Sequence, residues 1–258
     1  MPYTRHGSGV PLVILPGVGG RNGLPARLRR WLERREVAEL AKFRTVWRIE
    51  RRRGLKPETS IADLAAESAE IIRSLFATPV DVVGISTGGS IALQLAADHP
   101  ELVRRLVLVS AVHRLSDHGR STQRTVAALL RARRPRRAAA ALLADTGSGS
   151  IGATLLTVVG FIAPRVVVGH RDHDLVVTLD AEENFDLEKR LSQIRALTLI
   201  AAGAKDRFYS AELFESAARM MPRATLTIYP RLGHLGLQSN VPLAADILRF
   251  LAPGEDAN

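Results

Sequence analysis

Segments with the composition of buried strands alternate with segments of helical spacing, and this alternation restricts the possible folds more than any other feature. Residues 10–15, 80–85 and 102–109 are short runs rich in β-branched and apolar residues. Between the last two runs, a helical stretch continues to about Asp98 and stops at Pro100. Strands joined in this way need crossover connections, which produce a parallel sheet with helices on both faces. The sequence therefore predicts an α/β fold.

The predicted sheet contains about six mostly parallel strands, and a long helical insertion interrupts the alternation. The strands are expected at residues 10–15, 43–49, 80–85, 102–109, 196–202 and 224–229. From residue 113 to residue 189 the sequence is helical and rich in alanine and arginine, with a strand considered only at residues 166–168. We therefore predict a core domain of residues 1–112 and 190–258, with residues 113–189 inserted as a helical cap.

The composition fits a protein with a hydrophobic core and excludes several classes of reaction centre. Of 258 residues, 46% are hydrophobic and 24% are charged, a balance that excludes intrinsic disorder and collagen. The absence of cysteine excludes disulfide scaffolds, thiolate zinc sites, iron–sulfur clusters and cysteine nucleophiles. The longest apolar stretch, residues 151–163, is shorter than the ~18 residues that a membrane span needs, and no signal peptide is evident. We expect a soluble, cytoplasmic protein.

A formal net charge of +10 raises the question of a nucleic-acid or anionic partner. The only lysines are Lys42, Lys56, Lys189 and Lys205, so arginine supplies almost all of the positive charge. Abundant arginine with abundant alanine is typical of coding bias in a GC-rich genome, and we expect no nucleic-acid partner. The densest cluster, residues 131–137, is a candidate for holding an acidic substrate or phosphates. It lacks interleaved aromatic residues, and we interpret it as a solvated helix face.

The sequence Gly-Ile-Ser-Thr-Gly at residues 84–88 has the pattern Gly-x-Ser-x-Gly and lies between a predicted strand and a predicted helix. A sharp turn in this context exposes the serine hydroxyl, and it requires residues without side-chain bulk two positions before and after the serine. Ser86 is therefore our candidate nucleophile; the alternative is a glycine-rich packing turn. The N-terminus of the following helix directs free N–H groups at a developing oxyanion, with Thr87 N–H as one donor. Val18, in the glycine-rich turn after the first strand, is the second candidate donor.

A serine nucleophile needs a general base, and His234 has the best position among the seven histidines. It follows the predicted strand at residues 224–229, and ligands of open parallel sheets bind at the C-terminal ends of the strands. His99 lies beside Pro100 at a helix end, which favours a structural cap. The remaining alternatives are His6, His113 and His118, which lie near strand ends or in loops.

The base in turn needs a carboxylate that orients its ring and stabilises the imidazolium. Asp206 follows the predicted strand at residues 196–202, so it is expected at the same sheet edge as Ser86 and His234. Asp117, which follows the preceding core strand, is the alternative acid. If Asp206 is not the acid, it is a turn or helix-cap aspartate.

Together these features resemble the α/β-hydrolase fold over nearly the full chain. Serine, acid and histidine occur in the order that this fold uses. Residues 92–101 and 103–109 are also similar to the nucleophile helix and the next strand of that family. The resemblance implies Ser86 as nucleophile, Asp206 as acid and His234 as base, with a variable cap between the sixth and seventh strands.

Two departures from the family pattern concern the first strand. The usual His-Gly after this strand is Pro16-Gly17 here, so a helper histidine is absent and the oxyanion loop is expected to differ. The N-terminal hairpin that commonly precedes the strand is almost missing, which is why we expect about six strands. Neither departure affects the three candidate catalytic residues.

A histidine-rich segment, His170-Arg171-Asp172-His173-Asp174, alternates imidazoles with carboxylates and suggests a metal site at first sight. Adjacent residues on a short segment rarely converge on one ion, and no His-Glu-x-x-His pattern is present. We interpret the segment as a polar loop of the cap and predict no metal.

We predict a serine hydrolase that cleaves an ester-like or related acyl bond of a small-molecule substrate through an acyl-enzyme at Ser86. This chemistry needs no cofactor. The apolar residues 151–161 are expected either to line an acyl pocket or to pack onto the sheet. Because fold analogy does not fix a reaction, the alternatives are a lyase, an acyltransferase, a C–C hydrolase or a cofactor-free oxygenase of the same fold, and a non-catalytic small-molecule binder.

Overall fold

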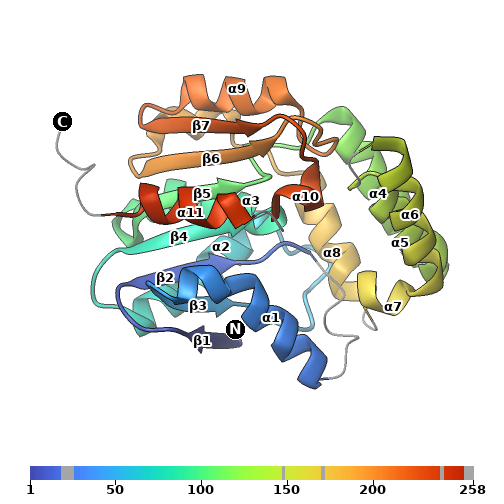
Figure 1. The fold of residues 1–258 in the computed structure, drawn as a ribbon, viewed down its shortest axis with the longest axis horizontal. Coiled ribbons are helices and arrows are strands. Elements are labelled where there is room, and N and C mark those ends of the chain that lie inside the picture. The colour runs from blue at the N-terminus through green and yellow to red at the C-terminus, as the bar shows by residue number, and fades with distance from the viewer. Residues whose placement is uncertain (19–25, 147–148, 170–171, 239–240, 253–258) are drawn as a thin grey trace.

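The computed structural model describes residues 1–18, 26–146, 149–169, 172–238 and 241–252, and it shows one central sheet with helices on both sides (Figure 1). The strands are β1 (Tyr3–His6), β2 (Pro11–Leu15), β3 (Thr45–Ile49), β4 (Val80–Ile85), β5 (Val103–Val109), β6 (Leu197–Gly203) and β7 (Ala224–Tyr229). In the described residues they form a seven-stranded sheet in the order β1-β3-β2-β4-β5-β6-β7. Strands β2 to β7 pair in parallel, which confirms the predicted α/β architecture.

β1 is a seventh strand that the sequence analysis did not anticipate. It pairs antiparallel with β3 at the edge of the sheet, with Tyr3 opposite Ile49 and His6 opposite Val46. Its four residues alternate between exposed and half-buried positions and contain no apolar run, so their composition does not distinguish them from a loop. This edge strand lies away from β4, β6 and β7, the strands that precede the candidate site residues.

Helices cover both faces of the sheet, and residues that alternate along each strand supply both cores. One face carries α2 (Ile61–Leu75), α3 (Thr87–Asp98) and α9 (Ala211–Met220), and the other carries α1 (Ala26–Ala41) and α11 (Val241–Phe250). In β2, Val13 and Leu15 belong to the first core, whereas Leu12 and Ile14 belong to the second. The strands therefore lie in the interior, and ligands can reach only the edges of the sheet.

Some of the many arginines are buried in the core domain. Arg105 in β5 is fully buried and donates hydrogen bonds to the backbone oxygens of Phe250 and Ala252, at the C-terminal end of α11. A cation at this position satisfies free carbonyl groups and is favoured by the helix dipole. Asp81 in β4 is also fully buried and accepts a hydrogen bond from Arg44 (3.1 Å). These arginines have structural roles, which coding bias alone does not describe.

The chain between β5 and β6 forms a group of helices at the C-terminal ends of the strands (Figure 1). They are α4 (Asp117–Arg131), α5 (Pro135–Ala144), α6 (Gly149–Ile162), α7 (Pro164–Val167) and α8 (Asp172–Glu183). The short helices η2 (Pro100–Leu102), η3 (Glu188–Gln193) and α10 (His234–Gln238) lie in connections of the core. The helical character expected for this region is present, and its division from the core at residues 113 and 189 stays a prediction.

One local expectation within the cap region was wrong. Residues 166–168 were considered as a strand, but they belong to and follow the helical turn α7. Pro164 begins this turn, because its fixed φ suits the first helical position and it needs no hydrogen-bond acceptor. Val168 N–H donates to Pro164 O (2.8 Å) and ends the turn.

Candidate active site

Ser86 lies at a sharp turn between β4 and α3, as the Gly-x-Ser-x-Gly pattern predicts. Its φ of 51° and ψ of −127° are uncommon for a residue with a side chain. The turn is held by hydrogen bonds from Ser86 N to Val109 O (2.9 Å) and from Gly89 N to Ser86 O (2.6 Å). A Cβ atom on Gly88 would lie only 2.0 Å from the backbone oxygen of Leu15. The glycine at this position is therefore required by close backbone packing beneath the serine.

The structure brings Ser86, His234 and Asp206 together in one chain of hydrogen bonds. His234 Nε2 lies 2.9 Å from Ser86 Oγ, and His234 Nδ1 lies 2.8 Å from Asp206 Oδ2. Because the carboxylate only accepts, the neutral ring carries its proton on Nδ1 and accepts the serine hydroxyl at Nε2. The second carboxylate oxygen, Oδ1, accepts from the backbone N–H groups of Phe208 (2.9 Å) and Tyr209 (3.2 Å). The orientation of the carboxylate is thus fixed from both sides.

The other sequence candidates for base and acid lie elsewhere. His6 is in β1, His99 follows α3, His113 follows β5 and His118 is in α4. The ring of His118 pairs with Asp145, at 3.0 Å between Nε2 and Oδ1. Asp117, the alternative acid, is the first residue of α4 and is exposed. The geometry therefore favours His234 and Asp206 over these alternatives.

His234 is buried between aromatic rings, and its surroundings favour the charged form of the imidazole. The rings of Phe208 and Tyr209 lie 4.9 Å and 6.1 Å from it between centroids, and Tyr209 is stacked. Burial lowers the pKa of His234, but the charge and hydrogen bond of Asp206 and the charge of Glu182 raise it, and the net pKa is above its ordinary value. The site can thus stabilise a proton taken up by this ring.

Glu182 of α8 is a buried carboxylate that contacts the first turn of α3, directly after Ser86. The sequence analysis did not identify it. Its exposed fraction is 1%. Oε2 accepts hydrogen bonds from Thr87 Oγ1 (2.5 Å) and Gln123 Nε2 (2.8 Å), and Oε1 accepts from Tyr209 Oη (2.9 Å) and Ser90 Oγ (3.1 Å). Four donors at once fit an ionised carboxylate, which only accepts. Glu182 thus connects α8 with α3, with α4 and with the loop after β6.

The loop after β2 lies directly against Ser86. A Cβ atom on Gly17 would be 3.1 Å from the Cβ of Ser86, which is a tight contact. A side chain at residue 17 would therefore require a small shift of the loop or of Ser86. Arg51, which follows β3, donates to the backbone oxygens of Pro16 (2.7 Å) and Gly17 (2.9 Å). Its contacts, like those of Glu182, join residues far apart in sequence, and no local sequence pattern marks either residue.

The backbone donors expected for an oxyanion lie on the two sides of this contact. Thr87 is the first residue of α3, so its N–H has no acceptor within the helix. Val18 follows Gly17 and is the last described residue before the gap at residues 19–25. Both N–H groups therefore belong to segments that meet at the serine.

The segment at residues 170–174 was predicted as a polar loop of the cap, but its described residues, 172–174, begin α8 and contact the loop after β3 instead. Asp174 of α8 accepts hydrogen bonds from the backbone N–H groups of Gly54 (3.0 Å) and Leu55 (2.9 Å). A ring nitrogen of His173 lies 2.9 Å from Leu55 O. These contacts tie α8 to the loop after β3, while His170 and Arg171 lie outside the described residues. Among the described residues, no group of three potential metal ligands is present.

Comparison with known sequences identifies related proteins along most of the chain. Residues 12–246 match a family model described as the alpha/beta hydrolase family. A protein described as "Putative carbamate hydrolase RutD" from Caulobacter sp. (strain K31) is 28% identical over 244 residues, covering 85% of this chain and 84% of that protein. A pimeloyl-(acyl-carrier protein) methyl ester esterase from Neisseria meningitidis serogroup A is 25% identical over 197 residues, covering 72% of this chain and 61% of that protein.

A similar fold is present among solved structures. MGS-M2, an alpha/beta hydrolase enzyme from a Medee basin deep-sea metagenome library, has a TM-score of 0.77 at 18% sequence identity. The match covers 100% of this chain and 96% of MGS-M2. The likeness confirms the fold predicted from the sequence.

We expect the substitution Glu182→Gln to lower the pKa of His234, because it removes a nearby negative charge that favours the imidazolium. In the wild type, the midpoint is expected above the ordinary histidine value of about 6.5. The measurement is a pH titration of the histidine ring signals by NMR, with the His234 signal assigned through His234→Gln.

Glu183→Gln is the matched control, because it removes the same charge from the next residue in the chain. The side chain of Glu183 pairs with Arg124 (2.5 Å). Its His234 midpoint should stay at the wild-type value. A Glu182→Gln protein that melts cooperatively and titrates at the wild-type midpoint would contradict the electrostatic role of Glu182.

Proposed function

Because the chain belongs to the alpha/beta hydrolase family, we propose that it is a serine hydrolase that cleaves an ester-like or related acyl bond through an acyl-enzyme at Ser86. The observation that carries the proposal is the continuous hydrogen-bond chain from Ser86 through His234 to Asp206. A hydroxyl, an imidazole and a carboxylate in this order are the groups that nucleophilic acyl transfer needs. We further propose residues 113–189 as the cap that covers the substrate.

In the first half of the proposed reaction, Ser86 Oγ attacks the carbonyl carbon of the substrate and passes its proton to His234 Nε2. Asp206 keeps the second ring nitrogen in hydrogen-bond contact and stabilises the imidazolium that forms. The tetrahedral intermediate collapses when the carbonyl re-forms, and the bond to the leaving group breaks. The leaving group takes the proton from His234, and the acyl group stays on Ser86.

In the second half, water replaces the leaving group. His234 takes a proton from water, and the resulting hydroxide attacks the acyl carbon of the ester on Ser86. The bond from the carbonyl carbon to Ser86 Oγ breaks, and Ser86 regains its proton from the imidazolium. The carboxylic acid leaves, and the protein returns to its starting state with one water consumed.

Arg51 supports a particular orientation of the second proposed oxyanion donor. Its guanidinium binds the carbonyl of Gly17, so this carbonyl points towards Arg51. In a trans peptide, the carbonyl and the N–H of the next residue point in opposite directions. The N–H of Val18 therefore points away from Arg51. We propose that Val18 N–H and Thr87 N–H hold the oxyanion, with Arg51 in place of the helper histidine as the group that positions the loop.

The relatives support hydrolysis of an acyl bond in a small-molecule substrate. Their descriptions include a carbamate hydrolase and a methyl ester esterase, and both names refer to a carbonyl bonded to a heteroatom leaving group. The site offers a nucleophile, a base and backbone donors for such a carbonyl. A screen of p-nitrophenyl esters of graded chain length would define the acyl group that fits under the proposed cap.

We expect the wild type to be labelled at Ser86 by a fluorophosphonate probe, because the probe reports an activated serine. Ser86→Ala should abolish labelling and lower turnover of an ester by roughly 10⁴-fold or more. Mass spectrometry of the labelled peptide identifies the modified residue. Ser74→Ala, on the exposed end of α2, should label like the wild type. A wild-type protein that turns over esters but resists the probe would argue against this mechanism.

We expect Arg51→Met to lower kcat with a smaller effect on KM, because the loop that presents Val18 N–H loses its anchor. The loss of one oxyanion donor lowers kcat by about 10²-fold to 10³-fold, which sets the upper range. Arg52→Met is the matched control, since Arg52 pairs with Glu67 (2.6 Å) away from the loop. Equal kcat values for the two variants would contradict the proposal that Arg51 positions the loop that holds the oxyanion.

A further inference from the structure

Helices α6 and α7 expose a set of large apolar side chains on the outer surface of the cap region. We call this set the apolar face; its members are Leu155, Val158, Val159, Phe161, Ile162 and Val166. The exposed fractions reach 63% for Leu155 and 74% for Ile162. Six of the ten exposed large hydrophobic residues among the described residues lie in this short segment, so their exposure is a local feature of the cap. Isolated exposed apolar residues are ordinary, whereas contiguous sets mark interaction sites.

The apolar face results from the way in which α6 packs on α5. Gly160 is buried at this contact, and a Cβ atom there would lie 2.6 Å from the backbone oxygen of Ala139. The helix thus turns a small residue towards its neighbour and leaves its large apolar residues outside. A surface helix usually buries its large apolar side chains and exposes polar ones, whereas α6 exposes several large apolar side chains. The exposed residues of α6 do not pack on the sheet, which was one role expected for residues 151–161; the other expected role, lining an acyl pocket, stays a prediction.

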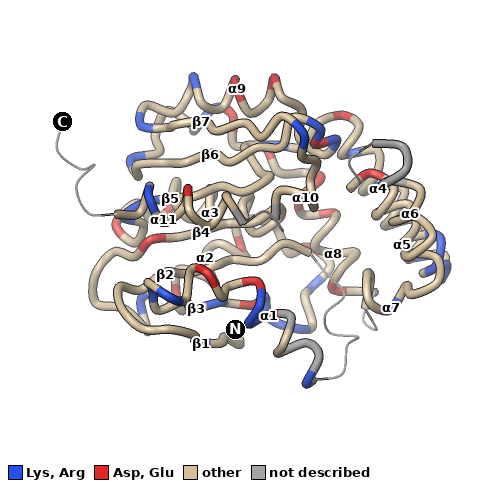
Figure 2. The backbone as a smooth tube through the Cα atoms, in the orientation of Figure 1, with Lys and Arg blue, Asp and Glu red and all other residues tan. Residues whose placement is uncertain are grey.

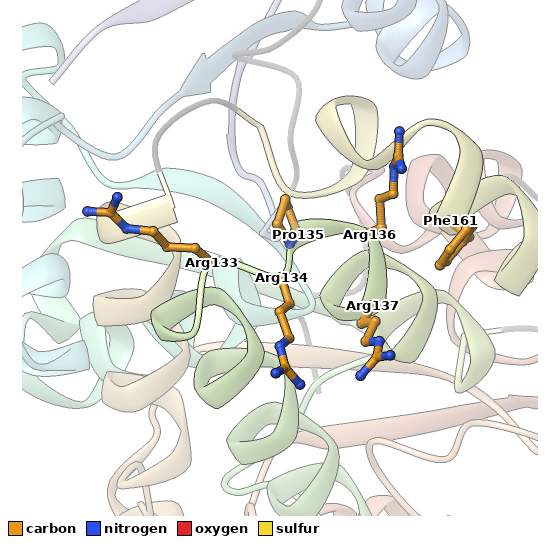
Figure 3. A pocket seen from close by; sticks show the side chains of 6 residues that line it. All are labelled: Arg133, Arg134, Pro135, Arg136, Arg137 and Phe161. Atoms are coloured by element: carbon orange, nitrogen blue, oxygen red, sulfur yellow. The ribbon is translucent and has the colours of Figure 1, made fainter.

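Four arginines lie beside the apolar face, two directly before α5 and two in its first turn. Arg133, Arg134, Arg136 and Arg137 are exposed, and no carboxylate of the described residues is paired with them. With Phe161 of α6 they surround an open pocket of about 550 Å³, and Figure 3 shows their side chains spreading in different directions. We call these four residues the arginine rim.

The arginine rim and the apolar face occupy the same outer edge of the molecule. In Figure 1, α5, α6 and α7 lie at the far right, beyond α4 and α8, and α5 and α6 are packed against each other. Figure 2 shows basic positions at the right edge of the molecule, near α5 and α6, and the sequence of α6 contains no charged residue. Free positive charge and free apolar surface therefore face solvent together.

We propose that the arginine rim and the apolar face bind the surface of an anionic phospholipid bilayer. Guanidinium groups bind phosphates through several donors, and anionic lipids attract basic residues near the membrane surface. Apolar side chains of a helix that lies in the plane of the interface enter the boundary between headgroups and acyl chains. The combination of both features on one helix pair fits this surface, and the proposal does not depend on the proposed reaction.

Other partners fit the same surface less well. A second copy of the chain meeting this face through a twofold axis would place the arginines of both copies close together, and like charges repel. A nucleic acid would match the charge but leave the aliphatic side chains against phosphates and sugars, and in the apolar face and arginine rim Phe161 alone is an aromatic residue that could stack on a base. A bilayer matches the charge and the apolar surface at once.

The length of α6 fits a position on the bilayer and not across it. Its 14 residues extend roughly 21 Å at 1.5 Å per residue, which is shorter than the ~30 Å of the hydrocarbon core. None of the helices in the described ranges is long and apolar enough to cross a membrane. The proposed mode is therefore attachment of the outer edge of the cap to the surface.

Co-sedimentation with vesicles tests the proposal directly, with phosphatidylcholine vesicles and phosphatidylcholine–phosphatidylglycerol vesicles as probes. We expect the wild type to sediment with the anionic vesicles and not with the neutral ones. Each arginine contributes about fivefold to binding near an anionic surface, so Arg136→Glu/Arg137→Glu should weaken binding by about 25-fold or more. The matched control is Arg195→Glu/Arg223→Glu, which makes the same charge change before β6 and β7, at the opposite end of the strands. It should bind more tightly than the rim variant.

The apolar contribution has its own pair of variants. Leu155→Gln/Ile162→Gln should weaken binding to anionic vesicles by roughly tenfold or more, because burial of two large side chains is lost. Phe43→Gln, at an exposed site in the connection between α1 and β3, should leave binding unchanged. Thermal melting verifies that each variant is folded.

Three results would overturn the proposal. The first is a wild type that sediments with neither vesicle, or equally with both. The second is a pair of rim and control variants that lose binding to the same extent. The third is a dimer in solution that Leu155→Gln/Ile162→Gln converts to a monomer without vesicle binding by the wild type, which would assign the face to a second copy of the chain.

Discussion

The close packing of backbone beneath Ser86 is the constraint on which the rest of the site depends. Gly88 brings the start of α3 against the last carbonyl groups of β2, and Gly84 brings β4 within reach of Ala92 in the same helix. A Cβ at either glycine would enter the space of atoms that cannot move without shifting the sheet or α3. This packing holds Ser86 at a positive φ, directs its hydroxyl towards His234 and places the free N–H of Thr87 at the same point.

Charge is arranged around this turn in complementary positions. Asp206 and Glu182 raise the pKa of His234 against the effect of burial, so the proposed transfer of a proton from Ser86 to this ring is favoured. Arg51 supplies a positive charge on the side of the loop after β2 and fixes that loop through its carbonyl groups. Glu182 comes from the proposed cap, and it ties the position of α8 to α3, the helix that follows Ser86.

Patterns that are local in sequence predicted strands β2 to β7, the turn and the three residues of the hydrogen-bond chain, but not the edge strand β1. The apolar runs before Ser86, Asp206 and His234 were recognisable, and parallel strands necessarily bring their C-terminal ends to one edge. Arg51 and Glu182 were not predictable, because their partners lie tens of residues away and each is one among many charged residues. The exposure of α6 was also hidden, since a run of apolar residues indicates burial unless the packing of its neighbours is known.

A rapid acid quench during turnover of a p-nitrophenyl ester, followed by peptide mass spectrometry, tests the central claim most directly. The account predicts that the acyl group of the ester is found on the peptide that contains Ser86, bonded to its hydroxyl, while substrate remains. The adduct should disappear as the ester is consumed, because water releases the acyl group. Steady turnover with the acyl group on another residue would contradict the account.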